Sequence, residues 1–130
     1  STRLGHVLVV DDDPAFRALV RRALDPLAGT LTEAGDGNAA RQSLRAQPCD
    51  LLVLDLHIPP PDGYALLAEL RADPRLATLP VVVVTAAELD PESTARLAST
   101  AAVLHKASLT PTLLSAAAAA ARRIVRADHD

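Results

Sequence analysis

The chain has 130 residues, of which 49% are hydrophobic and 2% aromatic, and its formal net charge is −3. This length and apolar content predict one globular domain with a substantial core and exclude a disordered tail. The negative charge and the scarcity of aromatic side chains argue against a nucleic-acid-binding surface, an anionic-membrane surface and a base-stacking platform.

Short apolar runs that suit buried strands alternate with segments whose apolar residues recur every three or four positions, as on one face of a helix. In chain order we expect a strand at 6–10, a helix at 14–27, a strand at 30–34, a helix at 37–47, a strand at 50–55, a helix at 63–73, a strand at 80–86, a weak helix at 91–100, a strand at 101–106 and a helix at 110–126. Strand followed by helix, repeated in this way, predicts an α/β fold with a parallel sheet and right-handed crossovers.

Two helices have the clearest apolar faces. The face of the first is expected to consist of Phe16, Leu19, Val20, Ala23, Leu24 and Leu27. The face of the last is expected to consist of Leu113, Ala117, Ala121 and Ile124. In the helix at 37–47, Ala40 and Leu44 should point inward, and Asp62 is well placed to cap the helix at 63–73.

Polar side chains stand at the carboxyl ends of four of the expected strands. They are Asp11, Asp12 and Asp13 after the first strand, Asp55 at the third, Thr85 at the fourth and Lys106 at the fifth. Sites in open parallel sheets lie beyond these strand ends. Neighbouring carboxylates repel and raise one another's pKa, which a hard divalent cation such as Mg²⁺ relieves. A carboxylate screened by a metal and an ammonium can attack phosphorus, so the pattern indicates phosphoryl transfer.

A structural interpretation exists for each of these acids. Asp13 directly precedes Pro14, which is the arrangement of a helix N-cap followed by proline at the first helical position. Asp11 and Asp12 could serve the helix dipole in the same way, but one cap needs only one acid. We therefore predict that Asp13 caps the helix and that Asp11 and Asp12 have another role.

Four segments together resemble the receiver domain of two-component response regulators, of the CheY-like superfamily. These segments are VLVVDDDP (7–14), DLLVLDLHIPPPDGY (50–64), PVVVVTA (80–86) and VLHKA (103–107). The resemblance spans nearly the whole chain. It implies a flavodoxin-like (βα)5 fold with a five-stranded parallel sheet in the order 2-1-3-4-5 and helices on both faces. We expect one receiver domain over residues 1–130, with its core at about 5–126 and no output domain in this chain.

The resemblance also assigns roles by motif position. Asp55 is the expected phosphoacceptor, which takes a phosphoryl group from a histidine kinase or a histidine phosphotransfer protein. Asp11 and Asp12 are expected to hold Mg²⁺ together with Asp55 and the backbone carbonyl of His57, with Mn²⁺ as the alternative ion. The His57 ring should face solvent, because Mg²⁺ prefers oxygen ligands.

Thr85 and Lys106 are expected to bind the phosphoryl group and to switch the conformation. Secondary tuning is expected at Ala86, Ala87 and Val103. Receivers often carry Tyr or Phe at the position of Val103 and a cis-proline after the lysine, where this chain has Ala107. The family's common Gly is replaced by Pro60, which predicts a stiffer loop. We predict that phosphate acceptance is retained while signalling through the fourth helix, fifth strand and fifth helix is unusual.

Two other functions fit parts of the sequence. Asp11-x-Asp13 has the spacing of haloacid-dehalogenase-like phosphatases, although the hydroxyl expected two residues later is replaced by Ala15. A phosphate-independent pseudo-receiver is the second alternative, and it would be expected to have lost Asp55 or the acidic pair. Against both we expect a phosphoacceptor that dephosphorylates itself slowly, and not a turnover enzyme.

The expected partners are the phosphodonor protein and an output partner or domain, without direct nucleic-acid binding by this domain. In the family the first helix helps to dock the kinase, which gives Phe16, Leu19 and Arg21 a second use. The single cysteine, Cys49, fits a cytoplasmic protein. No apolar run approaches the ~20 residues that a membrane span needs.

Overall fold

The computed structural model describes the backbone of residues 4–129 and the side chains of residues 4–123. Its strands form one five-stranded parallel sheet in the order β2-β1-β3-β4-β5. They are β1 (Gly5–Val10), β2 (Ala28–Ala34), β3 (Leu51–Asp55), β4 (Val81–Thr85) and β5 (Ala102–His105). The predicted fold class and strand order are therefore confirmed.

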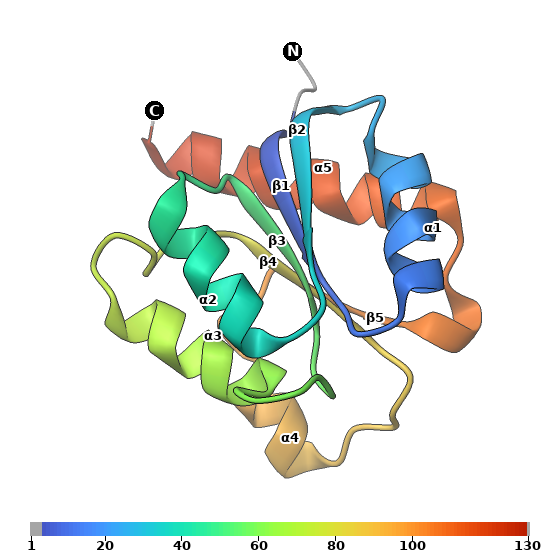
Figure 1. Ribbon diagram of the computed structural model, residues 1–130, viewed down its shortest axis with the longest axis vertical. Helices are drawn as coiled ribbons and strands as arrows, with labels where there is room; N and C mark the ends of the chain where they lie inside the picture. Colours follow the sequence, from blue (N-terminus) through green and yellow to red (C-terminus); the bar gives the residue numbers. More distant parts are fainter. Residues whose placement is uncertain (1–3, 130) are drawn as a thin grey trace.

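Helices cover both faces of this sheet (Figure 1). They are α1 (Pro14–Leu24), α2 (Gly37–Ala46), α3 (Gly63–Ala72), α4 (Pro91–Arg96), the short 3-10 helix η1 (Lys106–Ser108) and α5 (Pro111–His129). Figure 1 shows α1 and α5 together on one face, and α2 and α3 on the other with α4 below them. No helix in the described part of the chain has both the length and the apolar character needed to cross a bilayer.

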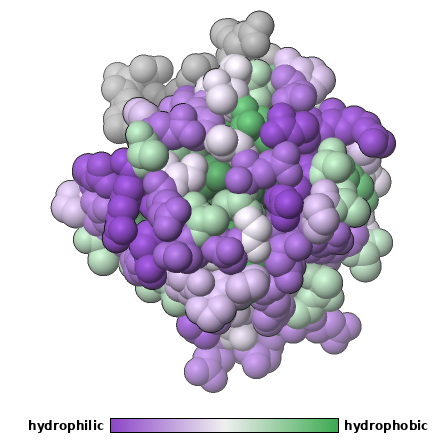
Figure 2. All heavy atoms as spheres, viewed as in Figure 1, coloured by the Kyte–Doolittle hydropathy of each residue, from purple (hydrophilic) through white to green (hydrophobic). Residues whose placement is uncertain are grey.

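The core consists of two apolar layers, one on each face of the sheet. Successive side chains of a strand point to opposite faces, so Leu8 and Val10 pack toward α2 and α3, whereas Val7 and Val9 pack toward α1 and α5. Every residue of β3 and β4 is buried, as predicted for central strands. The outer surface seen in Figure 2 is mostly hydrophilic, with hydrophobic residues visible as small separate areas.

The prediction for α1 was wrong in two details. The helix ends at Leu24 and not at Leu27, because Pro26 has no N–H group to continue the helical hydrogen bonds. Leu19 is 40% exposed and does not join the core, whereas Val20 and Leu24 are fully buried. The predicted caps are confirmed: Asp13 accepts a hydrogen bond from the Ala15 N–H group at α1, and Asp62 accepts one from Ala65 at α3.

The buried face of α5 also differs from the prediction. Leu113 is 51% exposed, and the buried residues are Leu114, Ala118 and Ala121. The side chain of Ile124 lies outside the described residues. Residues 116–121, the centre of the helix, are all alanine, so the sequence offers little contrast there between an inner and an outer face.

The helix α4 and the strand β5 are shorter than predicted. The helix ends at Arg96 and has no buried residue, because its sequence offers few apolar side chains to anchor it. The next residue, Leu97, is 3% exposed and turns into the core. The strand ends at His105, and Lys106 begins η1 instead of ending the strand.

Candidate functional site

Three acids meet at the carboxyl ends of β1 and β3. These strands are neighbours, and Val10 pairs with Leu54, so the residues that follow, Asp11 and Asp55, stand side by side. One carboxylate oxygen from each of Asp11, Asp12 and Asp55 lies within 4.8 Å of the others. Asp11 is 0% and Asp55 is 5% exposed, whereas Asp12 lies at the surface. The site is therefore buried on one side and open on the other.

The side chain of Lys106 faces this cluster. Its Nζ atom is 2.7 Å from Asp11 Oδ2 and 3.4 Å from Asp55 Oδ2. Burial alone would lower the pKa of Lys106, but its contacts with Asp11 and Asp55 raise the pKa above the ordinary value. Cis peptide bonds among the described residues occur only at Pro60–Pro61, so the Lys106–Ala107 bond is trans. The lysine reaches the site without the cis bond that is common after it in the family.

The buried acid Asp11 has a raised pKa. Burial raises the pKa of Asp11 more than the Lys106 ammonium and the Asp13 N–H group lower it, and the charge of Asp55 raises it further. The Lys106 ammonium is an ion-pair partner of Asp11 Oδ2 at 2.7 Å. A buried carboxylate of this kind, beside two further carboxylates, fits a hard divalent cation.

The loop after β1 holds Asp11 in place through its backbone and its side chain. The Asp13 N–H group donates to Asp11 Oδ1 at 2.9 Å, and Arg17 Nη1 donates to the Asp11 carbonyl oxygen at 2.7 Å. Arg17 also forms an ion pair with Glu33 of β2 at 3.0 Å. The sequence analysis missed this role of Arg17, because no local pattern places Glu33 beside it.

Tight backbone contacts hold the loop after β3. The Gly63 N–H group donates to the Leu56 carbonyl at 2.9 Å, and a Cβ atom at Gly63 would lie 2.5 Å from the carbonyl oxygen of Asp55. The Gly37 N–H group, at the start of α2, donates to the Pro59 carbonyl at 2.9 Å. The start of α3 therefore packs directly on the backbone of Asp55, and only glycine leaves room for this approach.

The remaining predicted residues surround the cluster. His57 is exposed, as expected for its ring, and its backbone N–H group donates to Asp55 Oδ1 over a long 3.4 Å. Thr85 is fully buried at the end of β4, and its Oγ1 accepts a hydrogen bond from the Ala87 N–H group at 3.1 Å. Among the described hydrogen bonds, none joins this hydroxyl to Asp55 or Lys106, so its switch role stays a prediction.

The other two tuning positions have different surroundings. Ala86 is exposed directly after β4. Val103 is half-buried and packs against the core layer on the α2–α3 side. An aliphatic side chain at this place has no ring that could move between a buried and an exposed position.

Comparison with known proteins agrees with this fold and this acid cluster. The family model described as the response regulator receiver domain matches residues 7–118. The chain is 42% identical over 81 residues to the chemotaxis protein CheY of Pseudomonas aeruginosa, which covers 62% of this chain and 65% of that protein. It is 38% identical over 84 residues to the DNA-binding dual master transcriptional regulator RpaA of Synechocystis, which covers 64% of this chain but 34% of the regulator.

Solved structures of receiver proteins have the same fold as this chain. The receiver domain of a signal transduction histidine kinase from Syntrophus aciditrophicus superposes with a TM-score of 0.81 at 27% identity, covering 93% of this chain and 92% of that one. The Mn²⁺-bound form of the response regulator Rcp1 superposes with a TM-score of 0.73 at 29% identity, covering 87% and 88%. The sheet with acids at its carboxyl edge defines a receiver-type α/β domain. The chain belongs to the response regulator receiver domain family.

Proposed function

We propose that this domain accepts a phosphoryl group on Asp55 from a histidine kinase or a histidine phosphotransfer protein, in a reaction that depends on Mg²⁺. The observation that carries the proposal is the convergence of Asp11, Asp12 and Asp55 within 4.8 Å, with the Lys106 ammonium beside them. Phosphoryl transfer requires positioning and charge compensation more than covalent chemistry, and this cluster offers both.

The proposed roles follow from the exposure of each group. Asp11, Asp12, one oxygen of Asp55 and the backbone carbonyl of His57 would hold the cation, which when bound screens the charges of the carboxylates and the phosphoryl group. The second Asp55 oxygen attacks the phosphorus. The bond from phosphorus to the donor nitrogen breaks, and its electron pair leaves with the donor imidazole.

Lys106 and Thr85 complete the proposed site. The product carries roughly one and a half to two additional negative charges, which the Lys106 ammonium offsets. The buried Thr85 hydroxyl donates to a phosphoryl oxygen, which requires it to turn from its present place beside Ala87. The loop 86–90 would move with it. Slow attack by water would later release phosphate, with the exposed His57 and the half-buried Ala87 flanking that path.

The docking of the phosphodonor is proposed to involve α1. This helix starts directly after the acidic loop, and its Leu19 is one of two large hydrophobic side chains found exposed in the described part of the chain. Arg21 of the same helix is engaged with Glu33 and Asp25, which leaves it less free to contact a partner. We infer a cytoplasmic domain, because such donors act there.

The geometry of the site gives little support to either of the two alternative functions. In a dehalogenase-like phosphatase Asp13 would act as an acid toward the substrate, yet its carboxylate caps α1 by accepting the Ala15 N–H group at 2.9 Å. A phosphate-independent interaction module would not need the buried carboxylates that this chain retains. Activity as a turnover enzyme is therefore not proposed.

The test is mass spectrometry after incubation with acetyl phosphate and Mg²⁺. The native chain should gain the mass of one phosphoryl group, and neither Asp55→Asn nor the native chain in EDTA should gain it. Asn has nearly the same shape as Asp but is a poor nucleophile, so the variant removes the chemistry and preserves the fold. A native chain that takes up no phosphate would support the phosphate-independent module, and turnover of a simple phosphomonoester would support the phosphatase.

A further inference from the structure

Phe16 contacts the lysine of the site through its ring. The Lys106 Nζ atom lies 4.2 Å from the centroid of this ring, although the two residues belong to different ends of the chain. Phe16 is the only phenylalanine in the sequence, and it sits in the first turn of α1. It is half-buried against the core layer on the α1–α5 side, so packing holds the ring in place.

The ammonium of Lys106 therefore lies between two carboxylates and an aromatic ring. Asp11 Oδ2 and Asp55 Oδ2 approach it at 2.7 Å and 3.4 Å, and the Phe16 ring faces it as well. The lysine side chain is 20% exposed. An aromatic face attracts a cation and keeps water from that side, and both effects strengthen when the cation is partly desolvated.

Little in its own segment of the chain constrains this lysine. Its four-carbon stem is flexible, and it begins the short helix η1, in which no residue is buried. No side chain caps η1 at its start. The residue after Lys106 is Ala107, which leaves the backbone freer than proline would. A constraint on the position of the ammonium must therefore come from tertiary contacts.

We propose that Phe16 is a positioning residue, whose ring holds the Lys106 ammonium beside Asp55 where the incoming phosphoryl group needs it. This role rests on the proposed function of Asp55 as phosphoacceptor. The ring offers no ligand atom for a metal, and its contact with the site is the one with Lys106, so it would act through the lysine. Without the ring, the ammonium would have to be ordered again in each transfer reaction, which costs entropy. We therefore expect the rate of phosphoryl transfer to fall.

The first test does not require phosphorylation. Lys106 Nζ lies over the ring, so the protons on the carbon bonded to it should show an upfield ring-current shift in the NMR spectrum. Phe16→Leu keeps an apolar side chain but removes the ring, and the shift should disappear. Phe16→Tyr keeps the ring, and the shift should remain. Thermal unfolding of both variants checks that each is folded.

The second test measures the rate of phosphorylation by acetyl phosphate with saturating Mg²⁺. This donor is too small to need a protein docking surface, so a docking role of Phe16 does not affect the result. Phe16→Leu should be roughly three- to ten-fold slower than the native chain. Phe16→Tyr keeps the aromatic face and should retain nearly the native rate. Leu113→Ala, which trims a 51% exposed side chain on α5, serves as the control and should leave the rate unchanged.

The outcomes separate the two proposals. If the native chain takes up phosphate and Phe16→Leu is equally fast, or if the lysine shift survives in Phe16→Leu, the positioning role is overturned while Asp55 remains the acceptor. A slow but folded Phe16→Tyr would overturn it too. If the native chain takes up no phosphate, the proposed function fails, and the positioning role fails with it.

Discussion

The two halves of the carboxyl edge of the sheet are held by very different amounts of packing. At the β1–β3 half, every residue of β3 is buried, and the acids Asp11 and Asp55 stand on strands with apolar layers on both faces. At the β4–β5 half, α4 and the edge strand β5 have no buried residue. The core thus fixes Asp11 and Asp55, whereas the surface of α4 and β5 can vary at low energetic cost.

This difference fits the departures from the family pattern at Val103 and Ala107, which both lie on the β4–β5 half. Acids packed beside buried strands cannot move without disturbing the core. Changes at Val103 or in α4 disturb few packed groups. We therefore expect substitutions in the first region to cost more stability than comparable substitutions in the second, unless the residue is one of the few anchors of α4 and β5.

The largest loss of stability is expected for Gly63→Ala, which affects the well-packed β1–β3 half (here called the rigid half). The added Cβ atom would lie 2.5 Å from the Asp55 carbonyl oxygen and 2.6 Å from the Leu56 Cα atom, and neither backbone group can give way cheaply. We expect a loss of about 3 kcal/mol in the free energy of unfolding, measured by urea denaturation. The displaced Asp55 should also accept phosphate more slowly.

Gly29→Ala is the matched control. Its Cβ atom would meet its nearest neighbour, the Gly5 carbonyl oxygen, at 3.7 Å, which is an ordinary contact. The free energy of unfolding should change by less than about 1 kcal/mol. Equal costs for the two alanine substitutions would show that the close approach at Gly63 is not what holds the acceptor strand.

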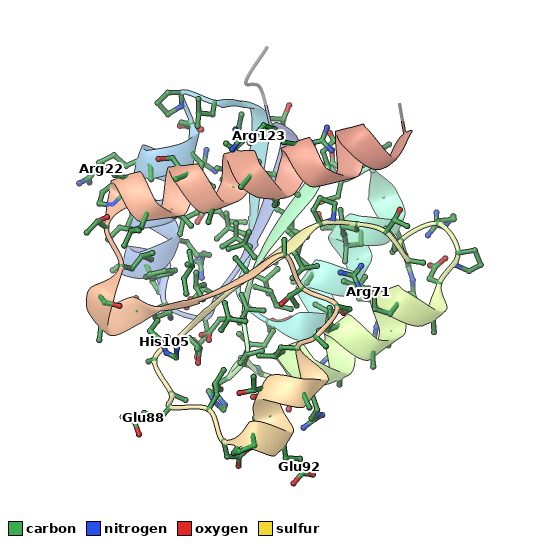
Figure 3. All side chains as sticks on the ribbon, turned by 180° about the vertical axis from the view of Figure 1, so that it is seen from behind. Arg22, Arg71, Glu88, Glu92, His105 and Arg123 are labelled. Atoms are coloured by element: carbon green, nitrogen blue, oxygen red, sulfur yellow. The ribbon has the colours of Figure 1, made fainter. Side chains whose placement is uncertain are left out.

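The second-largest loss of stability is expected at Arg71, which anchors the β4–β5 half (here called the loose half). From α3 it donates to the Ser99 side chain and carbonyl at 3.0 Å each, and to the carbonyls of Ala77 and Leu79 at 3.1 Å and 2.8 Å. Figure 3 shows this side chain projecting from α3, and Glu88 and Glu92 pointing outward before and within α4. Arg71→Ala should cost about 2–3 kcal/mol, because it leaves several carbonyls without donors.

Arg75→Ala is the control for this substitution. The Arg75 side chain is 65% exposed and forms only a 3.7 Å ion pair with Asp73. It should cost less than about 0.5 kcal/mol. Hydrogen exchange should show which region loosens, with faster exchange around Ser99 in Arg71→Ala. If exchange there stayed native, Arg71 would not be the anchor that joins α3 to the segment before β5.

The third prediction concerns the free-energy cost of burying the Asp11 carboxylate in the rigid half. Burial raises the pKa of Asp11 above its ordinary value of 3.8, so the folded chain binds this proton more tightly than the unfolded chain. The stability that Asp11 contributes is therefore fully present below its unfolded pKa and is lost as the pH rises through its folded pKa. In EDTA at pH 7, Asp11→Asn should be more stable than the native chain, as urea denaturation would show.

This advantage should shrink as the pH falls toward 3.8, where the native Asp11 is protonated as well. Mg²⁺ should stabilise the native chain and not Asp11→Asn. Asp13→Asn changes an exposed acid of the same loop, and Asn caps a helix as well as Asp does, so its stability should stay within about 0.5 kcal/mol. A less stable Asp11→Asn at pH 7 would mean that the contact with Lys106 outweighs the cost of burial.

The comparison also shows what the sequence could predict. Continuous apolar runs identified β3 and β4, and a parallel sheet brings the ends of such strands to one edge, so Asp11, Asp55 and Lys106 could be expected together before any coordinates were known. Their proximity follows from topology. Their roles remain predictions, since proximity alone does not show phosphate transfer.

What the sequence could not predict depends on contacts between distant segments. The rotation of α5 was wrong, because alanines on all sides left Leu113 and Leu114 equally plausible as core residues. The partners of Arg17 and Arg71 lie on other elements, at Glu33 and Ser99, and no local spacing reveals them. Such contacts depend on tertiary packing. The Arg17 contacts anchor the loop after β1, and the Arg71 contacts anchor the segment before β5.

The smallest effect is expected for the link between α3 and α4, where the Arg96 guanidinium lies 4.2 Å from the centroid of the Tyr64 ring. Arg96 is exposed, so the attraction should stabilise the fold by only about 0.5 kcal/mol. A double-mutant cycle with Arg96→Ala and Tyr64→Leu should give a coupling of this size, whereas Arg22→Ala, an exposed arginine on α1, should show no coupling with Tyr64→Leu. Amide exchange in α4 should become faster in Arg96→Ala while exchange in β3 stays native. A coupling of several times this size would mean that α4 is anchored more firmly than its lack of buried residues indicates, and the contrast between the two halves would narrow accordingly.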